Sequence, residues 1–387
     1  MEHGLVVMEV ALAMLIVAGA ALLTRSVSKL YDIDPGFEPS GVAATIVLAG
    51  AEVGAAENQQ KITEITQAIA ALPGVQSAGA TRTPPLRCRC NSFGLTIAGR
   101  ESEPSTYTYF RVGTTDYFRT MGMKLKSGRF FDSSDHPDSS GGTVIINEAF
   151  AKKYFPGEDP IGKRIGGGLP GSWRIVGVLG NVAEAHLTDD REPVRYYPAA
   201  VGTWFGQSTT FVARASAPGA EAALLDGMRR AINRVAPGYA VQQGTTMSRL
   251  FDNAVGPARQ VRSLLSMLSA LALILGAIGI YGVISHFAAR RKRDWAIRVA
   301  LGLPAWRVVR QIVVQGAALV LVGIAFGAVG TAALSRLLTS FLYGISNVDV
   351  VAFAAAAALL LIVGVLAALV PALRAGSVDP ALVLREQ

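Results

Sequence analysis

The sequence predicts an integral membrane protein with four transmembrane α-helices in a 1+3 arrangement, and a large α+β domain between the first helix and the other three. Four stretches of the chain are long and apolar enough to cross a bilayer. The residues between the first and second stretches have the charged and apolar mixture of a globular domain. Overall, 51% of the residues are hydrophobic and only 17% are charged, against about a quarter charged in a typical soluble domain.

The four apolar stretches predict the membrane spans. A helix needs about 20 predominantly apolar residues to cross the ~30 Å hydrocarbon core. The predicted spans are residues 5–24, 264–287, 312–334 and 350–373. Glu9 is the one acidic residue within them, and its place near the inner end favours an interfacial structural role over a role in transport. Glycines in the later spans predict close contacts between helices.

The first stretch has an alternative interpretation as a cleaved signal peptide. Ala18-Gly19-Ala20 resembles a cleavage site. No basic segment precedes the stretch, however, and its apolar run is longer than that of a usual signal peptide. We therefore expect residues 5–24 to be a membrane anchor.

The charges of the short loops predict the orientation. Residues 288–311 contain many arginines and the single acid Asp294, whereas residues 335–349 contain only Arg336 and Asp349. Positively charged short loops remain in the cytoplasm. This places 288–311 and both termini in the cytoplasm and residues 25–263 outside it. The net charge of +8 thus reflects topology, and we expect no nucleic-acid partner.

Residues 25–263 alternate short strands with helices. The predicted strands are residues 43–48, 75–81, 106–112, 143–146, 173–178, 209–213 and 239–242; the predicted helices are residues 56–72, 116–121, 147–154 and 220–236. Asn147 is the expected N-cap of its helix. This pattern predicts two β-α-β units flanking an inserted β-rich lobe at about 132–207. Gly256-Pro257 is expected to lead into the second span.

Two glycine-rich segments resemble nucleotide-binding motifs, but their context excludes that function. Residues 157–164 lack the Ser or Thr that ends a P-loop, and Pro160 removes a backbone donor. Residues 166–171 lack the preceding strand and following helix of a dinucleotide site, so we interpret them as a flexible loop. The spacing of the histidines and cysteines indicates no catalytic or metal site. Cys88 and Cys90 are compatible with a disulfide, with free thiols or with intermolecular pairing.

Short segments in a fixed order carry a resemblance to a known family. They are Asp34-Pro35-Gly36-Phe37, residues 72–75, 117–122, 144–148, 154–163, 175–178 and 293–302, and Asp379-Pro380. Together they make the chain similar to the MacB/FtsX-type ABC transporter permease family, with a MacB-like periplasmic core domain at 25–263 and an FtsX-like permease domain at 264–387. The sequence looks closest to the second half of the duplicated permeases of this family. We expect a half-length paralogue or a part of a longer permease.

The resemblance implies a non-catalytic permease subunit in the bacterial inner membrane, with its large domain in the periplasm. ATP and Mg²⁺ would be bound by a separate cytoplasmic ABC ATPase, and this chain would bind no cofactor. The other implied partners are a second permease copy, as a homodimer or a related chain, a periplasmic adaptor and membrane lipids. The loop at 288–311 would couple the ATPase to motion of the periplasmic domain. Its expected coupling residues are Arg293, Asp294, Trp295, Ile297, Arg298, Leu301 and Gly302.

The sequence leaves two questions open: how the chain docks to its ATPase, and whether it acts in export or in regulation. Asp294-Trp295-Ala296 replaces the Glu-Ile-Gly usual in the family, which bears on the strength of docking and on the partner. The favoured function is export or efflux driven by mechanotransmission. The alternative is an FtsX-like regulatory protein that signals across the membrane to a periplasmic partner such as a cell-wall hydrolase.

Overall fold

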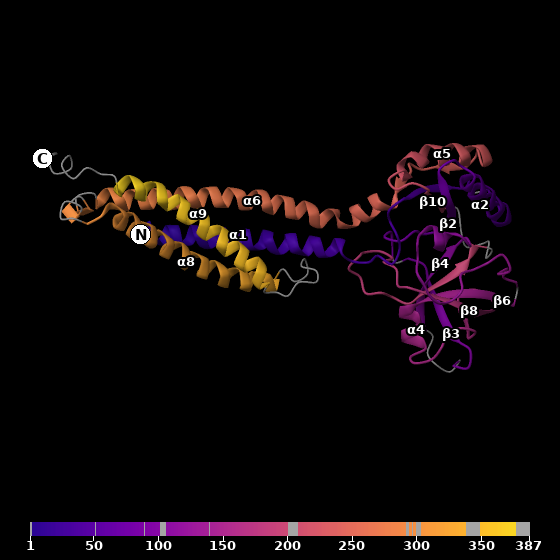
Figure 1. Ribbon diagram of the computed structural model, residues 1–387. Coiled ribbons are helices and arrows are strands. Elements are labelled where there is room, and N and C mark those ends of the chain that lie inside the picture. Colours follow the sequence, from indigo (N-terminus) through magenta and orange to yellow (C-terminus); the bar gives the residue numbers. More distant parts are fainter. Residues whose placement is uncertain are drawn as a thin grey trace. The chain divides into compact units, whose positions relative to one another are not determined.

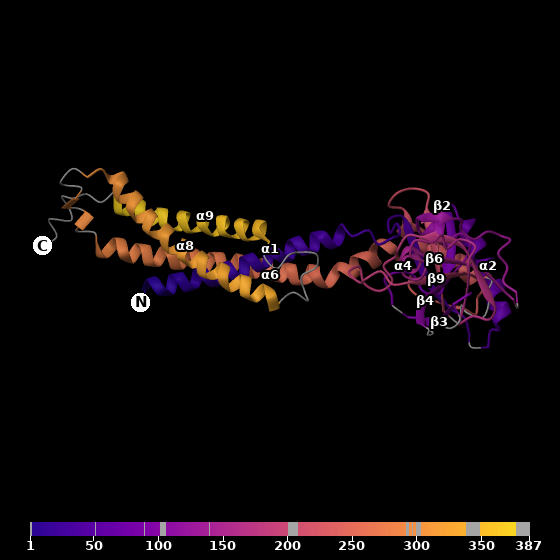
Figure 2. The ribbon, with the colours of Figure 1, turned by 90° about the horizontal axis from the view of Figure 1, so that it is seen from below.

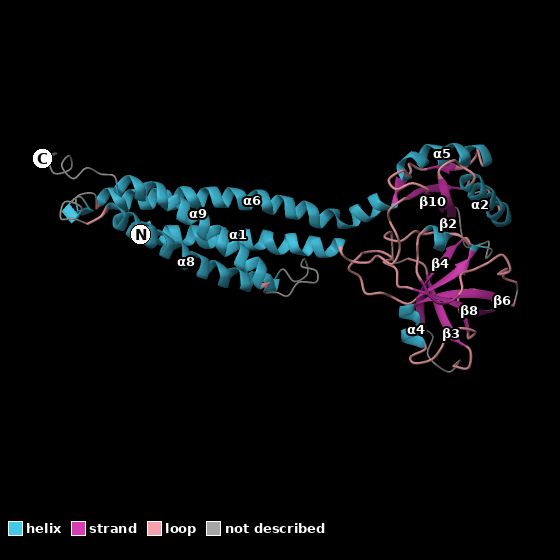
Figure 3. Ribbon diagram, in the orientation of Figure 1, coloured by secondary structure: helices cyan, strands magenta, loops and turns pink. Residues whose placement is uncertain are grey.

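The computed structural model describes residues 2–50, 52–88, 90–100, 106–138, 140–199, 208–291, 294–295, 297–298, 303–337 and 349–376. The chain divides into two compact units. Residues 1–32 and 256–387 form one, here called the membrane unit, and Ile33–Val255 form the other, here called the sheet unit. Among the described residues, all strands belong to the sheet unit (Figure 3).

Four long helices build the membrane unit. They are α1 (Glu2–Tyr31), α6 (Met247–Arg290), α8 (Ala305–Leu337) and α9 (Val350–Gly376). Each contains a segment long and apolar enough to cross a membrane, which confirms the four predicted spans. The helices run side by side in both views (Figures 1 and 2), and the N-terminus, the end of α6 and the end of α9 lie at the same end of the bundle.

Glycines allow these helices to approach one another closely. A Cβ atom added to Gly327 of α8 would lie 2.5 Å from the Cβ of Met14 on α1, and one added to Gly323 would lie 2.6 Å from that of Val10. Gly364 of α9 similarly faces Val320 of α8 at 2.6 Å. Lipid tails are as apolar as the side chains, so close packing rather than hydrophobic transfer drives association of helices in a bilayer. A larger side chain at these positions would separate the helices.

Helix α6 begins earlier than the sequence indicated. It starts at Met247 and continues through Gly256 and Pro257, where we expected the approach to the span. The Thr246 hydroxyl accepts a hydrogen bond from the Arg249 N–H at 3.2 Å, which fixes the first turn as an N-cap does. A single proline removes one backbone donor, and long membrane helices tolerate that loss.

The sheet unit contains twelve strands in one connected sheet. They are β1 (Val42–Leu48), β2 (Val75–Thr81), β3 (Ser92–Ile97), β4 (Thr106–Gly113), β5 (Leu125–Gly128), β6 (Gly141–Asn147), β7 (Arg164–Gly166), β8 (Ser172–Leu179), β9 (Val194–Pro198), β10 (Ser208–Ala215), β11 (Ala240–Val241) and β12 (Thr245–Thr246). Four helices accompany them: α2 (Ala55–Ala70), α3 (Tyr117–Thr120), α4 (Glu148–Tyr154) and α5 (Glu221–Val235).

The first part of the sheet has the order β11-β1-β10-β2 and is covered by α2 and α5. Helix α2 buries Ile62, Ile65 and Ile69, which recur at helical spacing along one face, and α5 buries Leu224, Met228, Ala231 and Ile232. Each fully buried Ile stabilises the fold by about 1.5–3 kcal/mol. This apolar stripe explains why the two helices pack onto the sheet.

The second part of the sheet closes on itself. Its order is β4-β3-β7-β8-β6-β9, and β9 pairs in parallel with β4 to complete a ring of six strands. Strands β3 and β4 come from before residue 132, so the ring combines them with the lobe expected at 132–207. Helix α4 packs beside it, with Asn147 as its N-cap, as predicted: the Asn147 Oδ1 atom accepts hydrogen bonds from the N–H groups of Phe150 and Val194 at 2.9 and 3.0 Å.

Aromatic side chains fill a second core in the sheet unit. Phe118 is fully buried and lies edge-on to Tyr117, Phe131 and Tyr196, with ring centroids 5.3 to 5.7 Å apart. The Asp34-Pro35-Gly36-Phe37 segment packs against this core through buried Phe37. Gly36 has a φ of 82° and lies directly against the Asn181 carbonyl, so only glycine fits there.

Candidate coupling segment

The segment between α6 and α8 contains the residues that the sequence predicted for coupling. Asp294, Trp295, Ile297 and Arg298 are helical. The backbone N–H of Trp295 donates to the Arg291 carbonyl at 3.0 Å, and the backbone N–H of Leu303 donates to the Arg298 carbonyl at 3.0 Å. These bonds connect the short helical segment to the end of α6 and to the approach to α8. Arg293, Leu301 and Gly302 lie outside the described residues.

Trp295 anchors this segment in the helix bundle. Its side chain is 3% exposed and packs in the same apolar cluster as Val308 and Ile312 of α8 and Ala372 of α9. A buried indole contributes a large apolar contact area. Trp295 therefore positions the segment and offers little surface to a partner.

The neighbouring side chains of the segment face outward. Asp294 and Arg298 are exposed, and Ile297 is 41% exposed. The Arg298 guanidinium carbon lies 5.3 Å from the centroid of the Trp295 ring, a cation–π distance. The buried tryptophan thus supports an exposed surface made of one acid, one base and one apolar side chain.

Trp306, at the start of α8, is an exposed residue of the loop 288–311 that was not among the coupling residues predicted from sequence. It is 57% exposed, and the Arg307 guanidinium lies 5.8 Å from the centroid of its ring. Tryptophan and arginine are enriched both at protein interfaces and at membrane surfaces. The sequence signal was a tryptophan directly before an arginine inside the basic loop.

The opposite end of the membrane unit is held by a salt bridge. Arg25 of α1 pairs with Asp349, and the Asp349 carboxylate also caps α9 by accepting from the Val351 and Ala352 N–H groups at 3.0 and 3.1 Å. The bond from Ala352, reinforced by the charge of Arg25, lowers the pKa of Asp349.

Both glycine-rich segments are held by contacts within the sheet unit. Residues 157–162 form a turn in which Gly157 and Gly162 have φ values of 75° and 83°, and Glu158 pairs with Lys163. Gly166 belongs to β7, and the buried guanidinium of Arg195 donates to the carbonyls of Gly166 and Gly167 at 3.4 and 3.0 Å. Gly166 thus belongs to a strand, whereas the sequence placed it in the loop at 166–171. The described residues contain no cluster of side chains suited to a metal ion.

The Cys88–Cys90 pair is a disulfide in this structure. The buried Arg111 guanidinium donates to the Cys90 and Cys88 carbonyls at 2.8 and 3.0 Å, and pairs with Glu184 at 2.7 Å. Leu86 and Asn91, on either side, have φ values of 62° and 65°. Such values are rare outside glycine, so Arg111 holds the disulfide loop in an unusual conformation.

Comparison with known proteins agrees with this architecture. The sequence model of the MacB-like periplasmic core domain matches residues 6–250, and that of the FtsX-like permease C-terminal region matches residues 266–380. The chain is 24% identical over 378 residues to the macrolide export ATP-binding/permease protein MacB of Shewanella sp. (strain W3-18-1), covering 91% of this chain and 51% of that protein.

A second relative and a solved structure extend the comparison. The macrolide export ATP-binding/permease protein MacB of Azoarcus sp. (strain BH72) is 23% identical over 337 residues, covering 84% of this chain and 48% of that protein. The chain thus spans about half the length of these curated relatives. The periplasmic region of MacB from Actinobacillus actinomycetemcomitans matches at 16% identity with a TM-score of 0.38, covering 58% of this chain and 97% of that one. On the match of its domains, the chain belongs to the MacB/FtsX-type family of ABC transporter permeases.

Proposed function

We propose that this chain is an export permease subunit that couples ATP hydrolysis by a separate cytoplasmic ABC ATPase to motion of its periplasmic domain. The two family domains, which together account for most of the chain, are the main support. The relatives are named for macrolide export, which favours export over the regulatory alternative. In this proposal the chain holds neither ATP nor Mg²⁺, and a second permease copy and a periplasmic adaptor complete the assembly.

The coupling segment supplies a surface suited to an ATPase. A buried tryptophan fixes the backbone, while Ile297 and Arg298 face outward beside Asp294. A short amphipathic helix that presents an apolar side chain among charges fits a groove on a partner. The backbone N–H of Trp295 donates a hydrogen bond to the Arg291 carbonyl at the end of α6. In this proposal, a displacement of the segment therefore also displaces that helix. We place the segment, and both termini, on the cytoplasmic side.

The test uses the ABC ATPase that co-purifies with the chain from native membranes. The double variant Ile297→Asp, Arg298→Glu is expected to reduce co-purification and stimulation of ATP hydrolysis about tenfold or more, because charge reversal and loss of an apolar anchor each cost an interface ~1–2 kcal/mol or more. The control is Arg259→Glu, the same charge reversal at an exposed position on α6, outside the coupling segment. Unchanged ATPase stimulation in the double variant, with normal membrane insertion, would remove the segment from the coupling route.

A further inference from the structure

The Cys88–Cys90 disulfide lies in the connection between β2 and β3 of the sheet unit. Its two cysteines have a sequence separation of 2, and both are partly exposed. In the chain-entropy model, a disulfide stabilises a fold by closing a loop in the unfolded chain, and the effect grows with the length of that loop. A disulfide that closes so short a loop contributes little to the stability of the fold, so its role lies elsewhere.

Hydrogen bonds hold the backbone around this disulfide independently of the sulfur–sulfur bond. The buried Arg111 guanidinium donates to the backbone carbonyls of both cysteines, at 2.8 and 3.0 Å. The backbone N–H groups of Leu86 and Arg87 donate to the carbonyls of residues 183 and 184, both at 3.1 Å. We therefore expect the loop to keep its place when the disulfide is reduced, with the two thiols close enough to pair again.

The two sulfur atoms have different neighbours. Arg87 and Arg89 stand on either side of Cys88 in the sequence, and Arg87 is exposed. The side-chain amide of Asn91 donates to the Cys90 Sγ atom at 3.6 Å. Positive charge attracts an incoming thiolate, and a hydrogen bond to sulfur stabilises the thiolate that leaves. These neighbours favour attack on Cys88, with Cys90 as the leaving group.

We propose that Cys88 and Cys90 form a redox-active site that exchanges with a dithiol outside the cytoplasm. A thiolate of the dithiol attacks the Cys88 sulfur, the bond to Cys90 breaks, and its electron pair leaves with Cys90 as a thiolate. The second thiolate of the dithiol then attacks the dithiol's own sulfur in the mixed disulfide and releases Cys88. The dithiol is oxidised to a disulfide by two electrons, and the two cysteines take up the protons that the dithiol lost.

The compartment of this exchange rests on the orientation in the proposed function, whereas the chemistry itself requires only this chain and a dithiol. Disulfides form and persist outside the cytoplasm, where thiol–disulfide exchange with other proteins sets their redox state. The site would thus respond to the redox state outside the cytoplasm. The loop between β2 and β3 would then present either a disulfide or two thiols.

The test follows the redox state of the purified full-length chain in detergent, without an ATPase. Dithiothreitol is the probe dithiol, and free thiols are alkylated and counted by mass spectrometry. We expect the pair to be reduced in the folded chain with unchanged circular dichroism, and to reform within the same chain in oxidised glutathione. Reduction only in denaturant, or unfolding on reduction, would indicate a structural disulfide and overturn the proposal. Two free thiols in chain prepared under oxidising conditions would also overturn it.

A charge variant tests the assignment of Cys88 as the attacked sulfur. Arg87→Glu is expected to slow reduction by dithiothreitol about threefold or more, because the reversed charge repels the attacking thiolate. The matched control is Lys152→Glu, the same reversal at an exposed position of α4, which should leave the rate unchanged. Equal rates in the two variants would contradict attack at Cys88. Because no ATPase takes part, failure of the coupling proposal leaves these results interpretable.

Discussion

The sheet unit and the membrane unit are stabilised in different ways. The sheet unit buries large aromatic side chains such as Phe118, Phe131 and Phe211, and contains a buried ion pair between Arg111 and Glu184. The membrane unit brings helices together at glycines. The difference follows from the solvent: burial of apolar area stabilises a fold in water, whereas in lipid the gain comes from close packing. We therefore expect loss of buried volume or charge to destabilise the sheet unit, and added volume at glycines to destabilise the membrane unit.

The largest effect is expected from the buried ion pair of the sheet unit. Arg111 and Glu184 have side-chain exposures of 4% and 9%. Arg111→Ala would leave a buried carboxylate without its partner and should lower the free energy of unfolding by about 3–5 kcal/mol. Chemical unfolding followed by circular dichroism measures it. The control Lys124→Ala breaks an exposed pair with Asp34 and should cost less than ~1 kcal/mol. Equal losses of unfolding free energy in the two variants would contradict the distinction between buried and exposed ion pairs.

Truncation of a buried aromatic side chain tests the packing of the sheet unit. Phe118→Ala removes a fully buried ring that contacts three others. The loss of apolar contact and the remaining cavity should cost about 3–5 kcal/mol. The same unfolding measurement applies. A loss below ~1 kcal/mol would mean that this core relaxes freely around the missing ring.

In the membrane unit the opposite substitution, small to large, should be damaging. Gly327→Val introduces a side chain where Met14 already lies 2.5 Å from a built Cβ, and should cost about 1–3 kcal/mol. Thermal unfolding in detergent provides the measurement. Gly276→Ala is the matched control, because nothing lies within 4 Å of a Cβ there. A similar decrease in melting temperature for both variants would exclude close packing at Gly327 as the cause.

The smallest expected effect is a pH dependence of the sheet unit. Burial alone would raise the pKa of Asp135, but hydrogen bonds from Arg129 and from the Asp132 N–H outweigh it and lower the pKa. A lowered folded-state pKa gives stability that is present above the unfolded value of about 3.9 and is lost as the pH falls through the folded value. Asp135→Asn should flatten the stability profile below about pH 4. An unchanged slope would assign the acid sensitivity to other carboxyl groups.

The sequence predicted the membrane spans and most of the sheet-unit elements because those signals are local. Apolar length identifies a span, and β-branched runs identify strands such as β1 and β8. Strands β3, β5, β7, β9 and β12 were missed: β7 has three residues, and β9 contains Arg195 and ends at Pro198. The places of β3, β7 and β9 depend on closure of the ring through pairing of β9 with β4, which is not encoded in a short window.

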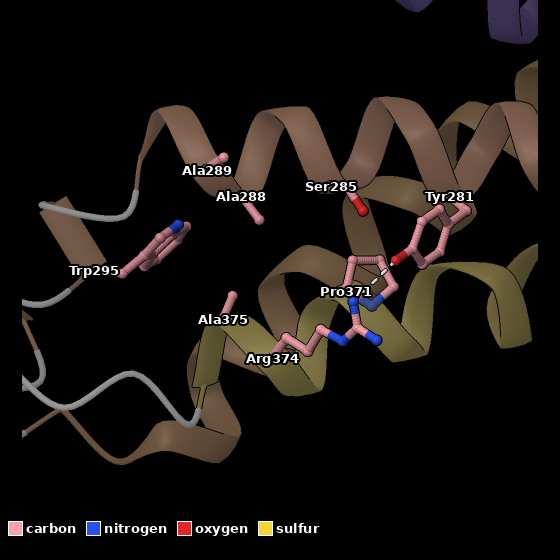
Figure 4. Close-up of a pocket in the computed structure, with 8 residues that line it drawn as sticks. All are labelled: Tyr281, Ser285, Ala288, Ala289, Trp295, Pro371, Arg374 and Ala375. Atoms are coloured by element: carbon pink, nitrogen blue, oxygen red, sulfur yellow. Dashed lines mark hydrogen bonds between the residues drawn. The ribbon is translucent and has the colours of Figure 1, made fainter.

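The candidate coupling segment was predicted from the resemblance to the permease family, which did not indicate which of its side chains are buried. The loop sequence gives no sign that Trp295 is buried while Ile297 is exposed, because that depends on how α8 and α9 pack around the indole. The cavity lined by Tyr281, Trp295 and Arg374 (Figure 4) was also not predicted. It joins Tyr281 and Arg374, which are far apart in the sequence, so no spacing rule could have brought them together.

The most direct test is accessibility of single cysteines in spheroplasts, with Cys88 and Cys90 replaced by serine. Asp159→Cys and Arg291→Cys place thiols at exposed positions in the sheet unit and at the end of α6. A membrane-impermeant maleimide should label position 159 in intact spheroplasts and position 291 only after permeabilisation. Labelling of position 291 alone in intact spheroplasts would invert the topology and contradict cytoplasmic coupling.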